Sequence, residues 1–95
     1  LESGYIQPKL DWCDVKEIVY NVCNRLSEET KNHKIVINID ENLPLFKLDY
    51  GLMEQIIYNL VYNSSQHTPK GATVSIQVKY EVDADYDLHI DLIKK

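Results

Sequence analysis

The sequence predicts an α+β two-layer sandwich, with helices on one face of a mixed sheet. Apolar residues recur at helical spacing in residues 15–26 and 52–61, and they alternate at strand spacing in residues 35–39, 74–78 and 88–92. Of the 95 residues, 44% are hydrophobic. A chain of this length buries roughly 60–65% of its unfolded surface, which is enough for one core. We therefore expect a single domain with the element order βαβ(β)αββ.

The first predicted helix follows a short extended stretch, Pro8 to Trp12, and runs to about Lys31. Asp14 can cap its first turn, and Glu17 three positions later gives an Asp variant of the capping box. The buried stripe of this helix is expected to contain Val15, Ile18, Val19, Val22, Cys23 and Leu26.

The isoleucines of residues 34–40 alternate with mostly polar neighbours, which is the period of a half-buried strand. Residues 42–44 break this pattern, and residues 45–48 form a second, brief extended piece.

A second helix is predicted from Tyr50 to about Gln66, with Asp49 as its cap. Its buried stripe is expected to contain Leu52, Met53, Ile56, Ile57, Leu60 and Val61. A separate polar stripe contains Gln55, Asn59, Asn63 and Gln66. The run Thr68-Pro69-Lys70-Gly71 ends the helix, because Pro disfavours helix in the preceding residue and Gly permits the turn.

The last two strands are predicted to form a hairpin across the acidic loop Glu81 to Asp87. Asp83, Asp85 and Asp87 are spaced like calcium ligands, but the loop lacks the Gly and the closing Glu of that motif. A solvated turn is therefore the favoured interpretation.

The charge pattern argues against nucleic-acid binding. The net charge is −5, and the ten Lys and Arg residues are scattered rather than gathered on one stripe. Cys13 and Cys23 are ten positions apart, which matches no zinc or redox motif, so free thiols are expected. No apolar run approaches the roughly 18 residues of a membrane span.

Asn59 and Asn63 are poor choices for the stability of the second helix. Asn is less favourable than Ala in a helix by about 0.5 kcal/mol, because its amide competes for backbone hydrogen bonds. The spacing of four puts both amides on one face. From spacing alone, two solvated polar positions are the simpler interpretation.

The surrounding sequence favours a binding role. The pattern Asp49-x-x-Leu52-x-x-Gln55-Ile56-x-x-Asn59-Leu60-x-x-Asn63-x-x-x-His67-Thr68-Pro69-x-Gly71 resembles the N box of the ATP-binding domain of two-component sensor histidine kinases, particularly the KdpD-like kinases. The resemblance implies a truncated Bergerat fold of the GHKL type. Residues 1–7 would be the end of a linker from the dimerisation and phosphoacceptor domain. Residues 8–95 would be the N-terminal half of the ATP-binding domain, with the N box at residues 49–71.

The resemblance also implies roles for four residues. Asn63 would ligate Mg²⁺ through its side-chain oxygen, and Asn59 would face the phosphates of ATP. Gln66 and His67 stand where the family commonly has Lys and Tyr. Gln66 can donate a hydrogen bond to phosphate but brings no charge, and His67 is a flat partner near the nucleotide or a solvent-facing residue at the helix end.

The 95 residues lack several features of the family, among them the later glycine-rich box and the third helix. In the family, an Asp-x-Gly-x-Gly box binds the adenine of ATP. It would follow the strand ending near Leu92, but no such sequence is present. The family's phosphoacceptor His precedes an acidic residue, and none of His33, His67 and His89 does. We therefore expect no catalytic residue here, weak or no ATP binding by residues 1–95 alone, and surface positions for His33 and His89.

The resemblance implies a parent protein that binds Mg-ATP and transfers the γ-phosphoryl group to a histidine in two-component signal transduction. Its partners would be the dimerisation and phosphoacceptor domain and a response regulator, and this domain would be cytoplasmic in a parent anchored in the bacterial inner membrane. Two alternatives remain open. One is a related ATPase that hydrolyses ATP, although such enzymes carry a Glu base where Asn59 stands. The other is a non-catalytic protein-interaction module on the same fold.

The expected number of helices also predicts self-association. The resembled fold covers its sheet with three helices, but this sequence supplies two. Some apolar side chains of the sheet are therefore expected to be partly open, from among Val74, Ile76, Val78, Leu88, Ile90 and Leu92. A homo-oligomer that pairs through this face or through the hairpin edge would cover them.

Overall fold

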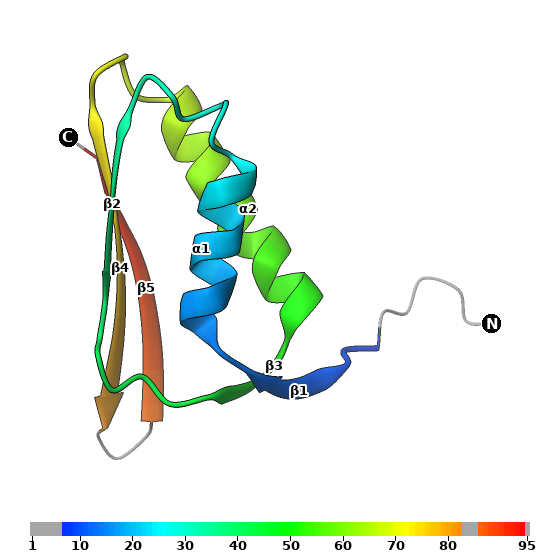
Figure 1. Ribbon diagram of the computed structural model, residues 1–95. Coiled ribbons are helices and arrows are strands. Elements are labelled where there is room, and N and C mark those ends of the chain that lie inside the picture. The colour runs from blue at the N-terminus through cyan, green and yellow to red at the C-terminus, as the bar shows by residue number, and fades with distance from the viewer. Residues whose placement is uncertain (1–6, 83–85, 95) are drawn as a thin grey trace.

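The computed structural model describes residues 7–82 and 86–94, which form two helices and two small sheets (Figure 1). In chain order the elements are β1 (Leu10–Cys13), α1 (Val15–Arg25), β2 (Lys34–Ile39), β3 (Phe46–Asp49), α2 (Tyr50–Gln66), β4 (Thr73–Val82) and β5 (Tyr86–Lys94). This order confirms the one predicted from the sequence. The acidic residues 83 and 85 lie outside the described residues, so the interpretation of that loop stays a prediction.

The larger sheet is mixed and has the strand order β2-β4-β5. β2 pairs in parallel with β4, with Ile37 opposite Ile76, and β4 pairs antiparallel with β5. β1 and β3 form a separate antiparallel ribbon, in which Trp12 is opposite Lys47. Each strand of this ribbon leads directly into a helix, so the ribbon holds the starts of α1 and α2 together (Figure 1).

Both helices lie on one face of the larger sheet, and the core lies between the two layers (Figure 1). The predicted stripe of α1 is confirmed, because all its members are buried except the half-buried Cys23. The core residues are Cys13, Val15, Ile18, Val19, Val22, Leu26, Ile57, Val61, Ile76 and Val78.

The expectation of a partly open sheet face is wrong for β4. Val74, Ile76 and Val78 are at most 1% exposed. Two helices are enough to cover this strand because β4 is the central strand, and its Ile76 and Val78 belong to the same core cluster as the buried residues of both helices. On β5, Ile90 is half-buried against the core, whereas the side chains of Leu88 and Leu92 lie outside the described residues.

Helix α1 begins as predicted and ends earlier than predicted. Asp14 is its N-cap, and its carboxylate accepts a hydrogen bond from the backbone N–H of Lys16 at 3.0 Å. The helix ends at Arg25 rather than near Lys31. Thr30 is buried, and both its backbone N–H and its hydroxyl donate to the carbonyl oxygen of Leu26. Residues 26–32 form turns, and these two bonds hold the buried Thr30 against the end of the helix.

Both cysteines are free, as predicted. Cys13 is buried and Cys23 is half-buried, and burial raises the pKa of the Cys23 thiol. A raised pKa keeps this thiol protonated at neutral pH, which fits a packing role. In the described part of the chain, no helix is both long and apolar enough to cross a membrane.

Candidate nucleotide-binding face on helix α2

The start of α2 is fixed by Asp49. One carboxylate oxygen accepts from the backbone N–H of Leu52 at 3.1 Å, and the other accepts from the backbone N–H of Lys9 at 2.8 Å. These bonds favour the ionised form, so they lower the pKa of Asp49. The predicted cap is confirmed, and it also ties the chain before β1 to the helix.

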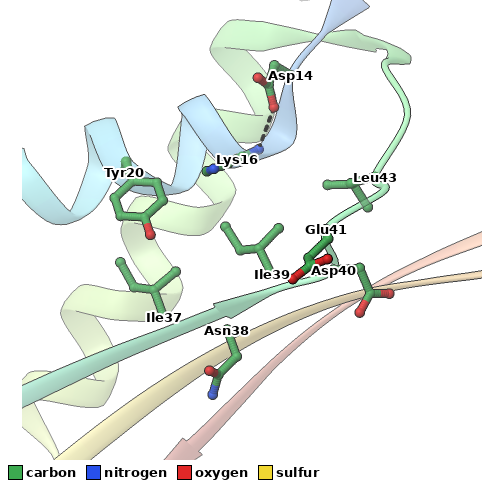
Figure 2. Close-up of a pocket in the computed structure, with 9 residues that line it drawn as sticks. All are labelled: Asp14, Lys16, Tyr20, Ile37, Asn38, Ile39, Asp40, Glu41 and Leu43. Carbon is green, nitrogen blue, oxygen red and sulfur yellow. Dashed lines mark hydrogen bonds between the residues drawn. The ribbon is translucent and has the colours of Figure 1, made fainter.

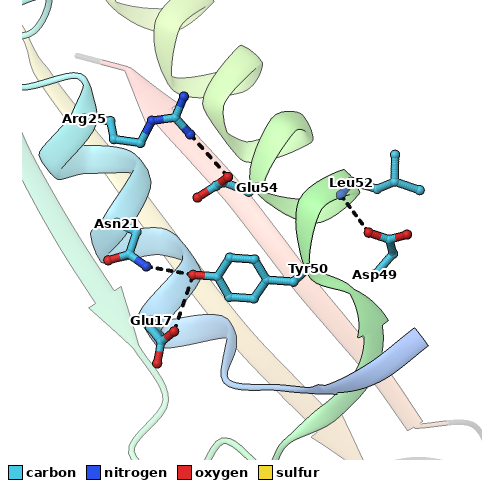
Figure 3. A network of polar contacts seen from close by, with 7 residues as sticks. All are labelled: Glu17, Asn21, Arg25, Asp49, Tyr50, Leu52 and Glu54. Carbon is cyan, nitrogen blue, oxygen red and sulfur yellow. Dashed lines mark hydrogen bonds and ion pairs between the residues drawn. The ribbon is translucent and has the colours of Figure 1, made fainter. Parts of the chain in front are cut away.

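A polar network links α2 to α1 (Figure 3). The amide nitrogen of Asn21 donates to the hydroxyl oxygen of Tyr50 at 2.7 Å, and that hydroxyl donates to Glu17 at 3.4 Å. One turn further along, the guanidinium of Arg25 lies 3.2 Å from the carboxylate of Glu54. These contacts lie on the side of α2 that faces α1.

The predicted polar stripe of α2 is exposed along its whole length, at Gln55, Asn59, Asn63 and Gln66. We call Asn59 and Asn63 the amide row. Among residues 7–82 and 86–94, neither of these two side chains makes a hydrogen bond. The structure therefore leaves both amides free to bind a ligand from solvent, on one face of a helix that is packed on its other side.

The predicted buried stripe of α2 is only half right. Ile57 and Val61 are buried and Met53 is half-buried, but Leu52, Ile56 and Leu60 are 37%, 52% and 42% exposed. These three residues follow one another at spacing four, and we call them the α2 ridge. Ile56 is three positions before Asn59, and Leu60 is three positions before Asn63, so the ridge lies beside the amide row. The sequence prediction failed because α2 is apolar on more than one side, and the core takes only one of them.

A shallow groove of about 400 Å³ opens beside Asn59. Its lining residues are Arg25, Gly51, Glu54, Gln55, Tyr58 and Asn59. The guanidinium of Arg25 lies 5.0 Å from the centre of the Tyr58 ring, in addition to its contact with Glu54. Sequence reasoning did not single out Arg25, because no local pattern signals a contact between the end of one helix and the middle of another.

The exit of α2 carries the other two predicted site residues. Gln66 is the last helical residue and is exposed, and His67 is the exposed C-cap, whose backbone N–H donates to the carbonyl of Asn63 at 3.1 Å. Thr68 follows, with its hydroxyl donating to the carbonyl of Ser64 at 2.8 Å. The turn closes at Gly71, whose φ of 86° favours Gly.

His33 is not the surface residue that the sequence suggested. Its Nε2 lies 3.2 Å from the carbonyl oxygen of Thr68, and since a carbonyl only accepts, Nε2 carries the proton and donates. Its Nδ1 is buried and has no hydrogen-bond partner in the described part of the chain. With the bond from the backbone N–H of Gly71 to the carbonyl of Asn32, at 2.7 Å, this contact clamps the exit of α2 to the segment after α1.

A second hollow of about 380 Å³ lies between the start of α1 and the end of β2 (Figure 2). Three carboxylates line it, from Asp14, Asp40 and Glu41. Two of them already serve the fold: Asp14 caps α1, and Asp40 accepts from the backbone N–H of Tyr80 at 2.9 Å. Among the described residues, no group of three or more His, Cys, Asp or Glu side chains could hold a metal ion.

The comparisons with known proteins point to one fold. The catalytic domain of histidine kinase ThkA superimposes with a TM-score of 0.79 over 90% of this chain and 58% of that chain, at 16% identity. Full-length ShkA in complex with AMPPNP gives a TM-score of 0.72, over 82% of this chain and 17% of that chain, at 22% identity. The fold is that of a histidine kinase catalytic domain. The predicted fold class is therefore confirmed.

The sequence relatives agree with the histidine kinase fold. Sensor protein KdpD of Clostridium acetobutylicum is 38% identical over 84 residues, which are 88% of this chain and 9% of that protein. Sensor protein EvgS of Escherichia coli K12 is 28% identical over 75 residues, which are 76% of this chain and 6% of that protein. The chain thus spans less than a tenth of the length of either relative. No family model matches it.

Proposed function

We propose that this chain is the part of a sensor histidine kinase that holds the phosphates and the Mg²⁺ of ATP through the amide row of α2. In the whole protein, the γ-phosphoryl group would pass to a histidine of the dimerisation and phosphoacceptor domain, and then to a response regulator. The observation that carries this proposal is the pair of free, exposed amides on one face of a helix, in a chain with the histidine kinase fold.

The donor set fits the proposed metal. Mg²⁺ prefers oxygen ligands and keeps several waters, so one neutral amide oxygen plus phosphate oxygens can complete its shell. Asn63 would supply that oxygen, and its exposure leaves room for the remaining waters. When bound, Mg²⁺ neutralises phosphate charge during phosphoryl transfer.

The other residues would orient the nucleotide. Asn59, one turn before Asn63, would donate its amide N–H to a phosphate oxygen. Gln66 would donate a further hydrogen bond, which carries no charge and is weaker than one from Lys. His67, which caps the helix, would lie flat against the nucleotide. The clamp through His33 would hold this end of the helix in place.

Asn59 also favours phosphoryl transfer to protein over hydrolysis of ATP. Hydrolysis needs a group that accepts a proton from the attacking water, and a neutral amide does not do so. An exposed amide at this position can bind phosphate, but it cannot act as a general base. A kinase is therefore the better supported proposal for the whole protein.

The test in the whole protein is autophosphorylation with labelled ATP. Asn63→Ala should lower the rate of phosphohistidine formation by about 100-fold or more, because the metal loses its protein ligand at the charged transition state. Asn38→Ala is the matched control, since Asn38 is an exposed Asn on β2. Wild-type rates in the Asn63→Ala protein would overturn the role of Asn63.

A second test uses the 95-residue chain and titration calorimetry with Mg-ATP. Weak binding is expected, with a Kd above about 10 μM, because Asn59, Asn63 and Gln66 are neutral and Arg25, which lines the groove beside Asn59, already pairs with Glu54. A Kd at or below that value would show that the α2 face alone suffices for tight binding. In either case, Asn63→Ala should weaken any binding that is measured.

A further inference from the structure

His33 contains a buried polar atom that packing does not explain. Its Nδ1 is buried and has no hydrogen-bond partner among the residues that the structure describes. A buried polar atom without a partner costs stability, so an apolar side chain would pack better at this position. The other ring nitrogen, Nε2, donates to the carbonyl oxygen of Thr68 at 3.2 Å. This hydrogen bond is therefore what a histidine contributes here.

We infer that His33 is a positioning residue of the nucleotide site. Its Nε2–H fixes Thr68, and Thr68 in turn places the end of α2, where Gln66 and His67 would contact ATP. This inference rests on the proposed function, and it assigns a role to a residue outside the N box of residues 49–71. The contact is internal to the chain, so the inference does not depend on what covers the exposed side of α2.

Thr68 connects the imidazole to the last turn of α2. Its carbonyl oxygen accepts from His33, and its hydroxyl donates to the carbonyl oxygen of Ser64 at 2.8 Å. Ser64 is 5% exposed and follows Asn63 directly in the chain. The backbone N–H of His67 closes the same turn by donating to the carbonyl oxygen of Asn63 at 3.1 Å. A shift of Thr68 therefore moves the turn that carries the site residues.

Two backbone hydrogen bonds hold the chain beyond this turn. The N–H of Gly71 donates to the carbonyl oxygen of Asn32 at 2.7 Å, and the N–H of Lys34 donates to that of Ala72 at 3.0 Å. They lie where β2 and β4 begin to pair, whereas the bond from His33 reaches the chain earlier, directly after the C-cap of α2. Removing the imidazole should therefore loosen the end of α2 without unfolding the sheet.

A positioning role predicts a particular split between KM and kcat. Gln66 and His67 would contact ATP already in the ground state, so displacing them raises KM more than it lowers kcat. His33→Phe keeps a flat ring but has no N–H donor. In the whole protein, we expect it to raise the KM for Mg-ATP by about 3- to 10-fold and to change kcat by less than about 2-fold.

Two further variants show whether the donor itself is responsible. His33→Gln keeps a side-chain N–H donor, so its KM should lie closer to that of the wild type than the KM of His33→Phe does. Asp14→Ala is the control for a general loss of stability, because Asp14 caps α1 and lies at the other end of the helical layer from the exit of α2 (Figure 1). Its KM should equal that of the wild type.

A double-mutant cycle separates positioning from stability. In a protein that already carries Gln66→Ala and His67→Ala, His33→Phe should raise KM by less than about 2-fold more, because the side chains that His33 places are gone. A merely structural role would give the same factor in both backgrounds.

Nuclear magnetic resonance of the 95-residue chain without nucleotide tests the contact itself. In mildly alkaline buffer, the ¹⁵N shifts of His33 should show one tautomer with the proton on Nε2, while the exposed His67 populates both. His33→Phe should speed hydrogen exchange at the backbone N–H of His67. The N–H of Leu52, at the start of α2, should exchange as in the wild type.

The outcomes separate this inference from the proposed function. A mixture of tautomers at His33, or an equal rise of KM in His33→Phe and Asp14→Ala, would overturn the inference. So would a wild-type KM in His33→Phe beside an inactive Asn63→Ala protein, which would leave the proposed function standing. Wild-type rates in Asn63→Ala would overturn both.

Discussion

Helices α1 and α2 pack against each other on the same sheet, but they bury their apolar residues to different extents. In α1, the predicted apolar stripe is inside, and the outer face carries charges such as Lys16 and Glu17. In α2, Ile57 is buried while its neighbour Ile56 is 52% exposed, and the outer face is neutral. Packing therefore explains the apolar stripe of α1, while Tyr20 of the same helix is 48% exposed. The exposed ridge and amides of α2 do not contribute to the core. They indicate that this face of α2 binds a ligand or another part of the protein.

The neighbouring isoleucines of α2 give the sharpest test of this difference. Ile57→Ala should lower the free energy of unfolding by about 3 kcal/mol, because it leaves a cavity in the core. Ile56→Ala should lower it by less than about 1 kcal/mol, since the side chain is half in solvent and Ala is a good helix former. Urea unfolding at a low protein concentration measures both. Similar losses in the two variants would contradict the division of α2 into a packed side and an open side.

Substitutions of Asp14, the N-cap of α1, test whether the stability of this helix depends on its cap as well as on its core. Asp14→Ala should lower the free energy of unfolding by about 1 kcal/mol, because the backbone N–H of Lys16 loses its acceptor. Asp14→Asn should keep most of this stability, since its side-chain oxygen can still accept the bond. Thermal unfolding of the two variants would show the contrast, and equal losses would mean that the charge of Asp14 matters more than the bond.

The cap of α2 should make that helix sensitive to acid. The bonds from the backbone N–H groups of Lys9 and Leu52 lower the pKa of Asp49. A lowered folded-state pKa means that its contribution is complete above the ordinary Asp value of about 3.9, and is lost as the pH falls through the lower folded value. The protection of the first turn of α2 against hydrogen exchange, taken relative to the intrinsic rate at each pH, should fall in that acidic range. In Asp49→Asn this loss of protection should be smaller, and an unchanged profile would argue against the cap as its source.

The smallest expected effect concerns the polar network between the helices. Tyr50→Phe removes the hydroxyl that links Asn21 and Glu17, and it should lower the free energy of unfolding by about 0.5 kcal/mol, because these groups are exposed to water. The same variant should leave Ile57 buried, which amide chemical shifts can check. A loss above about 2 kcal/mol would mean that the network holds the helices together more than the core does.

Much of the fold could be predicted from local patterns. Helix starts at Asp14 and Asp49 follow from short side chains that accept backbone N–H groups a few residues ahead, which is a local interaction. The strands follow from alternation, and the end of α2 follows from Thr68 to Gly71. The exposure of the amide row was also predicted, because Asn is seldom buried without partners. These features depend on residues close in sequence.

Other features were decided only by the tertiary structure. Which apolar residues of α2 are buried depends on where α1 and β4 lie, since the helix has apolar side chains on more than one side and the core accepts one of them. The bond from His33 to Thr68 joins residues that are 35 positions apart, and no local signal marks it. The parallel pairing of β2 with β4 likewise requires the whole of β3 and α2 to cross between them. The sequence alone determined the helix caps, the periodicities and the exposed amides, because each depends on neighbours in the chain. Burial of α2 and the clamp at its exit required the folded chain, because they depend on which distant residues meet.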